Sequence, residues 1–335
     1  MMNPYKQIDL SKVKTYPIKN RKNLVKIKDF AKIPKEDRLV GQPSWLSFNQ
    51  FIDSLPDILI GTDLRNLINA ICQAYRQRKP IIWAFGAHVI KCGLSPIIIE
   101  LMKKGVITAI ATNGAGMIHD FEIALIGETS EDVSQSLSDG SFGMATETGA
   151  LINEAIIEGA KQDIGIGQAV GKMIATQQVA TQQLEYREYS ILYHGFKLGI
   201  PVTVHVAIGT DIIHQHPNAS GEAIGKSGMI DFRIFANQVA NLDGGVYLNI
   251  GSAVILPEVF LKALTIARNL GNKIEDIKDV EDFVTANFDM FPQYRPMTNV
   301  VKRPTSKAGT GYSFIGHHEI MIPLLAFGVL NEIHK

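Results

Sequence analysis

Small residues and histidines gather where two apolar runs of this chain end. The run Ile81–Phe85 is followed by Gly86-Ala87-His88, and the run that begins at Val106 ends in Thr112-Asn113-Gly114-Ala115-Gly116. Glycines let the backbone approach a ligand closely and can present N–H groups to a phosphate. Histidine can donate or accept a proton near neutral pH. We therefore expect both small-residue stretches to line a nucleotide crevice, with His88 and His119 beside it as acid–base groups.

Two later apolar runs end in the same way. Ile200–Ile208 is followed by Gly209-Thr210-Asp211, and Gly245–Ile250 is followed by Gly251. If all four runs are parallel strands, their carboxyl ends meet at one edge of a sheet, where ligands bind in such folds. Gly209 and Gly251 are therefore predicted to belong to the same crevice. The sequence contains no G-x-G-x-x-G dinucleotide fingerprint at these turns.

Lys302 and Cys92 are candidate nucleophiles. Two valines precede Lys302, and partial desolvation would lower its pKa and make the amine able to form an imine. The competing interpretation is an ordinary exposed lysine. Cys92 follows the first small-residue turn, where it is either a reactive thiol or a packing residue.

The histidines of the third apolar run and the turn after it are candidate metal ligands. His205, His214, His216 and Asp211 offer nitrogen and oxygen donors that suit zinc. Their spacing matches no common zinc signature, so the sequence predicts no metal site.

The order of elements predicts the fold class. At least five probable strands alternate with amphipathic helices, from Leu64–Arg76 to the apolar final helix Ile320–Ile333. This alternation is typical of an α/β protein with a doubly wound, Rossmann-like parallel sheet. We expect a basic N-terminal arm over residues 1–45 and a single large α/β domain over 46–335, entered through a short helical lead-in at Phe48–Leu55.

Composition narrows the classes of function. The 335 residues carry no formal net charge, although residues 1–38 hold eleven basic and four acidic side chains. A neutral chain gives no reason to expect nucleic acid as a partner. No apolar stretch reaches the length of a membrane span, the N-terminus lacks the apolar region of a signal peptide, and the two cysteines fit a reducing compartment. We therefore expect a cytoplasmic protein that has no membrane partner.

The strand-end motifs resemble those of the deoxyhypusine synthase family over roughly residues 80–330. Thr112–Gly116, with Asp120 after it, is similar to the family's Thr-Thr-Ala-Gly-Gly motif and acidic pair. Ile200-Pro201-Val202 followed by Thr210-Asp211 is similar to its Ile-Pro-Val strand and Thr-Asp turn. Lys302 falls near its imine-forming lysine.

The resemblance implies an NAD-dependent transferase that acts on an amine or polyamine, passing an aminobutyl-type group through an imine on Lys302. It implies NAD as cofactor, bound by the small-residue turns with Asp120, Asp211 and Gly251, and a homo-oligomer. The family's paired histidines after the glycine-rich strand are replaced here by Ser252–Leu256. Two alternatives therefore stay open: the same fold with a substrate that is not a polyamine, and an NAD-binding oligomer without catalysis.

Overall fold

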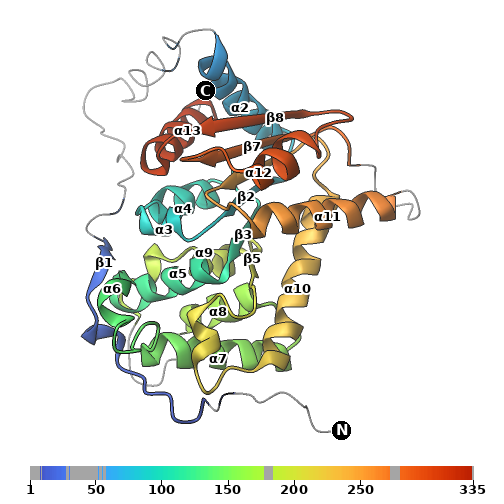
Figure 1. Cartoon of the computed structure of the whole chain (residues 1–335). Coiled ribbons are helices and arrows are strands. Elements are labelled where there is room, and N and C mark those ends of the chain that lie inside the picture. Colours follow the sequence, from blue (N-terminus) through green and yellow to red (C-terminus); the bar gives the residue numbers. More distant parts are fainter. Residues whose placement is uncertain are drawn as a thin grey trace.

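A six-stranded parallel sheet forms the centre of the computed structural model (Figure 1). The structure describes residues 8, 10–27, 30, 52, 55, 58–176, 184–271 and 280–333. The strands follow the order β5-β3-β2-β6-β7-β8, which is the 3-2-1-4-5-6 order of a Rossmann sheet. Their bounds are β2 (Ile81–Phe85), β3 (Ala109–Asn113), β5 (Val202–His205), β6 (Val246–Ile250), β7 (Val284–Asp289) and β8 (Thr310–Ile315).

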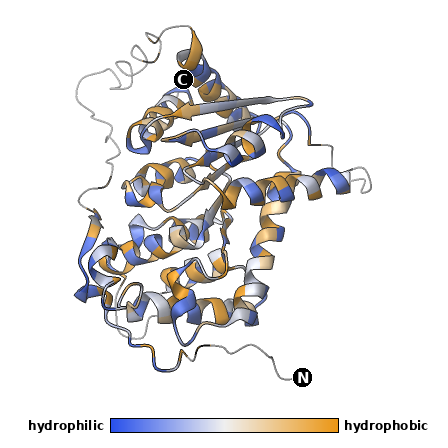
Figure 2. Cartoon of the chain, in the orientation of Figure 1, coloured by the Kyte–Doolittle hydropathy of each residue, from blue (hydrophilic) through white to orange (hydrophobic). Residues whose placement is uncertain are grey.

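Helices cover both faces of this sheet, so its strands other than the edge strand β8 are almost wholly buried. Ile81, Trp83 and Phe85 of β2 belong to one hydrophobic cluster, and Ile82 and Ala84 to another. In Figure 2 hydrophobic residues run through the helices beside the sheet. The first cluster includes residues of α2 (Leu59–Arg76), α3 (His88–Lys91), α4 (Ser95–Lys103), α5 (Gly114–Ile126), α7 (Thr146–Lys161), α8 (Ile166–Thr176), α9 (Ile191–Leu198) and α13 (His318–Ile333).

The opposite face is covered by α10 (Gly221–Ala240), α11 (Ile255–Gly271) and the π-helix η5 (Met297–Lys302). Tyr247 of β6 stacks on Phe260 of α11 with ring centroids 3.8 Å apart. The predicted doubly wound α/β fold is thus confirmed, with two cores separated by one sheet.

The described part of the N-terminal segment packs along the body of the molecule. Its strand β1 (Asn23–Lys26) pairs antiparallel with β4 (Glu128–Glu131). Tyr16 forms a parallel bridge with Ala145, just before α7. The remaining short elements are η1 (Ile18–Asn20), α6 (Val133–Ser136), η3 (Arg187–Tyr189), η4 (Ile212–Gln215) and α12 (Tyr294–Pro296).

Two elements differ from the sequence expectation. Gly114-Ala115-Gly116 is the first turn of α5 rather than a loop, since Asn113 caps the helix by accepting a hydrogen bond from the Gly116 amide. The edge strand β8 adds a sixth strand after η5. The predicted helix at Phe48–Leu55 lies almost wholly outside the described residues. Of the helices that the structure describes, none has the length and apolar character required to cross a bilayer.

Candidate functional site

The strand order reverses between β2 and β6, and a glycine directly follows each of these strands. A Cβ atom on Gly86 would lie 3.0 Å from the carbonyl oxygen of Gly251, so the two turns touch through their backbones. Gly251 has φ +63°, a conformation that favours glycine, and a side chain there would meet the His318 ring at 2.6 Å. Ligands of open α/β sheets bind at such a switch point. The structure thus brings Gly86, Ala87, His88 and Gly251 together at the predicted edge.

The end of β3 is tied to the end of β2. The Thr112 hydroxyl donates to the Phe85 carbonyl at 2.9 Å, and the Asn113 side chain accepts from the Gly116 amide at 2.8 Å. A Cβ atom on Gly116 would overlap the Thr112 hydroxyl. These groups fix the start of α5, whose free N–H groups and dipole favour a negative charge.

Asp211 supplies that charge. A side chain on Gly114 would overlap its carboxylate, which therefore lies directly against the first turn of α5. Asp211 is 7% exposed, and its Oδ2 has no hydrogen-bond partner among the residues that the structure describes. Burial raises the pKa of Asp211 to about 6, although a backbone hydrogen bond from Ala207 lowers it. This carboxylate can accept a hydrogen bond from a cationic ligand.

A pocket of about 260 Å³ opens beside Asp211. It is smaller than the pockets of about 300–1,000 Å³ that hold drug-sized ligands, and its size suits a small metabolite. Lys91 of α3 and Ala115 of α5 border it, so it lies at the carboxyl edge of the sheet. The other lining residues are Arg21, Ile118, His119, Glu122, Ser130, Glu131, Val133, Phe142, Thr210 and Ile212.

A buried polar network forms one wall of the pocket. Glu122 is 1% exposed and accepts hydrogen bonds from Arg21, Thr129 and Thr148. Although burial alone would raise its pKa, the His119 hydrogen bond and the Arg21 charge hold the pKa of Glu122 at about 2. His119 Nδ1 lies 2.6 Å from the Thr129 hydroxyl. His119 therefore lines the pocket, and it is engaged with Thr129 and Glu122.

Asp120 has a structural position instead. Its carboxylate accepts hydrogen bonds from the Ser190 hydroxyl at 2.6 Å and from the amides of Ile191 and Leu192 at 2.7 and 3.0 Å. It thereby ties α5 to the first turn of α9. The structure gives its predicted role in cofactor binding no support, because all of these contacts are made within the fold.

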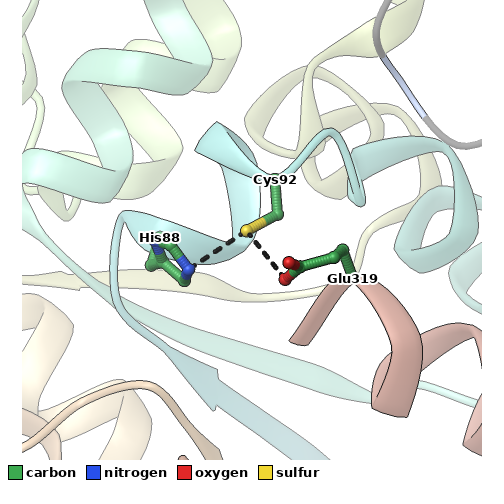
Figure 3. A group of neighbouring side chains, drawn as sticks. All are labelled: His88, Cys92 and Glu319. Atoms are coloured by element: carbon green, nitrogen blue, oxygen red, sulfur yellow. Dashed lines mark hydrogen bonds between the residues drawn. The ribbon is translucent and has the colours of Figure 1, made fainter. Parts of the chain in front are cut away.

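His88, Cys92 and Glu319 converge beside the switch point (Figure 3). His88 Nε2 lies 3.2 Å from Cys92 Sγ, and Cys92 Sγ lies 3.7 Å from Glu319 Oε2. Burial and the Glu319 carboxylate raise the pKa of the Cys92 thiol to about 12. Without a bound cation the thiol therefore stays protonated at neutral pH, which disfavours it as a nucleophile.

Lys302 lies away from these groups. Thr285 at the start of β7 donates its hydroxyl to the Val300 carbonyl at 2.8 Å, and Gly311 at the start of β8 lies against the Val301 carbonyl. Lys302 follows directly, so within one chain it lies near the amino edge of the sheet. Its side chain is exposed. The structure does not bring Lys302 together with the other predicted site residues.

The histidines considered as zinc ligands also stay apart. His205 is buried in β5, where burial lowers its pKa to about 3, and His216 Nε2 contacts the Gly143 carbonyl at 2.9 Å. Throughout the described ranges, the one group of three or more histidine, cysteine or acidic side chains placed to share a metal ion is His88, Cys92 and Glu319.

No family model matches the chain, and no curated protein matches it. Among solved structures, it is similar to a mutant of AgrE in binary complex with L-arginine, with 13% identity, a TM-score of 0.48 and coverage of 82% of this chain. This chain spans only 33% of the length of that protein. A Methanococcus maripaludis protein proposed to be of the LOR/SDH type gives 14% identity and a TM-score of 0.47, over 90% of this chain and 74% of that one.

A protein from Entamoeba histolytica with a proposed deoxyhypusine synthase identity gives 10% identity and a TM-score of 0.48. The match covers 90% of this chain and 96% of that one. Likenesses at these values establish neither a family nor a function for this chain.

Sequence reasoning missed several residues of this edge. In the sequence Arg21 is one of many cations in a basic arm, and Glu122 and Glu319 belong to no recognisable motif. Arg21 reaches Glu122 across 101 positions of the chain, and Glu319 reaches Cys92 across 227. The available signals were weak: Glu122 is an acidic residue between the apolar residues Phe121 and Ile123, and Glu319 follows a histidine pair.

Proposed function

We propose that this protein is an NAD-dependent enzyme that acts on a small-molecule amine. The observation that carries the proposal is the shared edge: the switch point of a Rossmann-ordered sheet lies beside a pocket with the buried carboxylate of Asp211. Gly86 and Gly251 would let the dinucleotide approach the backbone closely. Asp211 would pair with the ammonium group of the substrate, which would satisfy its unpartnered oxygen.

The charges in the pocket favour a cationic ligand. Three carboxylates, from Asp211, Glu122 and Glu131, face two cations, Arg21 and Lys91. Arg21 already pairs with Glu122 and lies 3.7 Å from Glu131. Asp211 is thus the carboxylate of the pocket that is left to pair with a ligand. His119, with Thr129 and Glu122 behind it, would exchange a proton with the substrate.

A zwitterionic substrate such as an amino acid is the second candidate. Lys91 is exposed and lines the same pocket as Asp211. It could hold a carboxylate while Asp211 holds the amine. Stabilisation by amino acids but not by putrescine or spermidine would favour this version, and the reverse pattern would favour a polyamine.

Calorimetric titration with NAD tests the cofactor half of the proposal. We expect Gly86→Val to weaken NAD binding roughly tenfold or more, because its side chain would push apart the two turns, which touch through their backbones. Asp211→Asn should retain NAD binding and lose stabilisation by amines in a thermal-shift assay. Lack of NAD binding by the unmodified protein would refute the proposal. NAD binding without turnover of any amine would instead support a non-catalytic NAD-binding protein.

A further inference from the structure

We propose that His88, Cys92 and Glu319 form a zinc site at the switch point. The three side chains offer one nitrogen, one sulfur and one oxygen donor, a set that zinc accepts. All three donor atoms lie within 4.8 Å of one another. The site is independent of the proposed amine pocket, since none of its ligands lines that pocket.

The separations of Cys92 Sγ from the other two donor atoms are close to those around one tetrahedral ion. Zinc–sulfur bonds of about 2.3 Å and zinc–nitrogen or zinc–oxygen bonds of about 2.0–2.2 Å place neighbouring ligand atoms about 3.6 Å apart. The observed separations are 3.2 Å between His88 Nε2 and Cys92 Sγ, and 3.7 Å between Cys92 Sγ and Glu319 Oε2. Small shifts of these side chains would therefore accommodate the ion.

Two helices fix the ligands in this arrangement. His88 begins α3 and Cys92 caps its end, so the two residues stand one helical turn apart on the same face. Glu319 lies in the first turn of α13, and Figure 3 shows its carboxylate and the His88 ring directed at the sulfur.

The buried ring of His318 stands behind His88. The two ring centroids are 5.3 Å apart at an interplanar angle of 62°, and His318 is 1% exposed. Its Nε2 contacts the Phe288 carbonyl at 3.2 Å. His318 therefore acts as a positioning residue, because it restricts the orientation of the His88 ligand.

The site has room for a fourth, non-protein ligand. His88 and Cys92 are half-buried, and half of the Glu319 side chain is exposed. Structural zinc sites are closed by four protein ligands, whereas three ligands with an open position are typical of catalytic zinc. At the open position the ion would carry a water molecule, and it could polarise a carbonyl group or lower the pKa of that water.

Cobalt substitution tests the site in the whole 335-residue chain. After removal of metal with a chelator, we expect one Co²⁺ per chain, with a thiolate-to-cobalt charge-transfer band and the visible bands of a tetrahedral centre. Cys92→Ser should abolish the charge-transfer band, whereas Cys72→Ala should retain it, since Cys72 is buried under α13 beside the Val329 carbonyl. Glu319→Gln and His88→Gln should weaken Zn²⁺ binding at least tenfold in competition with a chromophoric chelator.

Thermal melting of each variant without metal serves as the control for misfolding. A metal-free Cys92→Ser protein that melts with the unmodified chain, but gains no stability from Zn²⁺, supports the site. Cobalt binding that survives Cys92→Ser, or an unmodified chain that takes up no Co²⁺ or Zn²⁺, would overturn it. NAD titration of the same proteins tests the proposed cofactor binding separately from the proposed zinc site.

Discussion

Asp211 illustrates how a buried ligand-binding group can lower the stability of the fold. The carboxylate is buried against α5, and the described part of the chain leaves its Oδ2 without a hydrogen-bond partner. The start of α5 compensates for only part of the lost hydration. A group that destabilises the fold and faces a pocket is typical of functional sites.

Replacement of Asp211 by asparagine should therefore stabilise the protein at neutral pH. The folded-state pKa of about 6 lies above the ordinary value of 3.8, so between these pH values the folded chain retains a proton that the unfolded chain has lost. The free energy of unfolding of the unmodified protein then falls by about 3 kcal/mol as the pH rises through this window. We expect Asp211→Asn to be more stable by up to about 3 kcal/mol at pH 7 and nearly equal at about pH 3, measured by chemical denaturation. Equal stability at both pH values would contradict the argument.

Arg21 presents the opposite case, a buried charge that is fully paired. Its side chain and that of Glu122 are 5% and 1% exposed. Arg21→Ala would leave Glu122 buried without its cation, and we expect a loss of about 3–5 kcal/mol in denaturant unfolding. Lys26→Ala is the matched control on the same segment, because its pair with Glu128 is far more exposed and should contribute less than about 1 kcal/mol. Similar losses in both variants would show that detachment of the segment, rather than the buried charge, sets the cost.

At the scale of the element, close packing between helices limits the size of the side chains that the contact positions tolerate. A side chain on Gly171 in α8 would approach the Leu192 carbonyl of α9 to 2.5 Å, whereas one on Gly225 in α10 would meet nothing within 4 Å. We expect Gly171→Ala to destabilise by about 1–3 kcal/mol through overpacking. Gly225→Ala should stabilise by about 0.5–1 kcal/mol, because alanine loses less backbone entropy in a helix. Thermal melting of both variants measures the contrast, and a stable Gly171→Ala protein would argue against the α8–α9 contact.

The sequence predicted elements well where their pattern is local. Ile81–Phe85 is a strand with the expected bounds, and α13 follows the apolar run at Ile320–Ile333 closely. Helix α5 was missed because glycines at positions 114 and 116 suggested a loop, while the cap from Asn113 and the contact of Asp211 with Gly114 require them. The convergence of Cys92 with Glu319 depends on how α13 returns to the switch point, and no local pattern encodes that.

At the scale of the whole molecule, the sheet separates Lys302 from the other predicted site residues. The loops that follow β2, β3 and β6 meet at the carboxyl edge, while η5 carries Lys302 back to the starts of β7 and β8. An imine on Lys302 could reach the switch point only if a second copy of the chain presented its own lysine there. The predicted aminobutyl transfer therefore depends on the predicted self-association.

Borohydride trapping on size-separated protein tests this dependence. With NAD and a polyamine present, we expect no mass increment on Lys302 in the monomeric fraction, because the exposed amine lies at the opposite edge from the pocket. Lys302→Ala should leave NAD affinity unchanged for the same reason, with the exposed Lys307→Ala as the matched control. An increment confined to an oligomeric fraction would indicate that the lysine acts across a subunit interface. An increment in the monomer would mean that η5 can leave the sheet edge, which the hydrogen bond from Thr285 to Val300 and the contact of Gly311 with Val301 oppose.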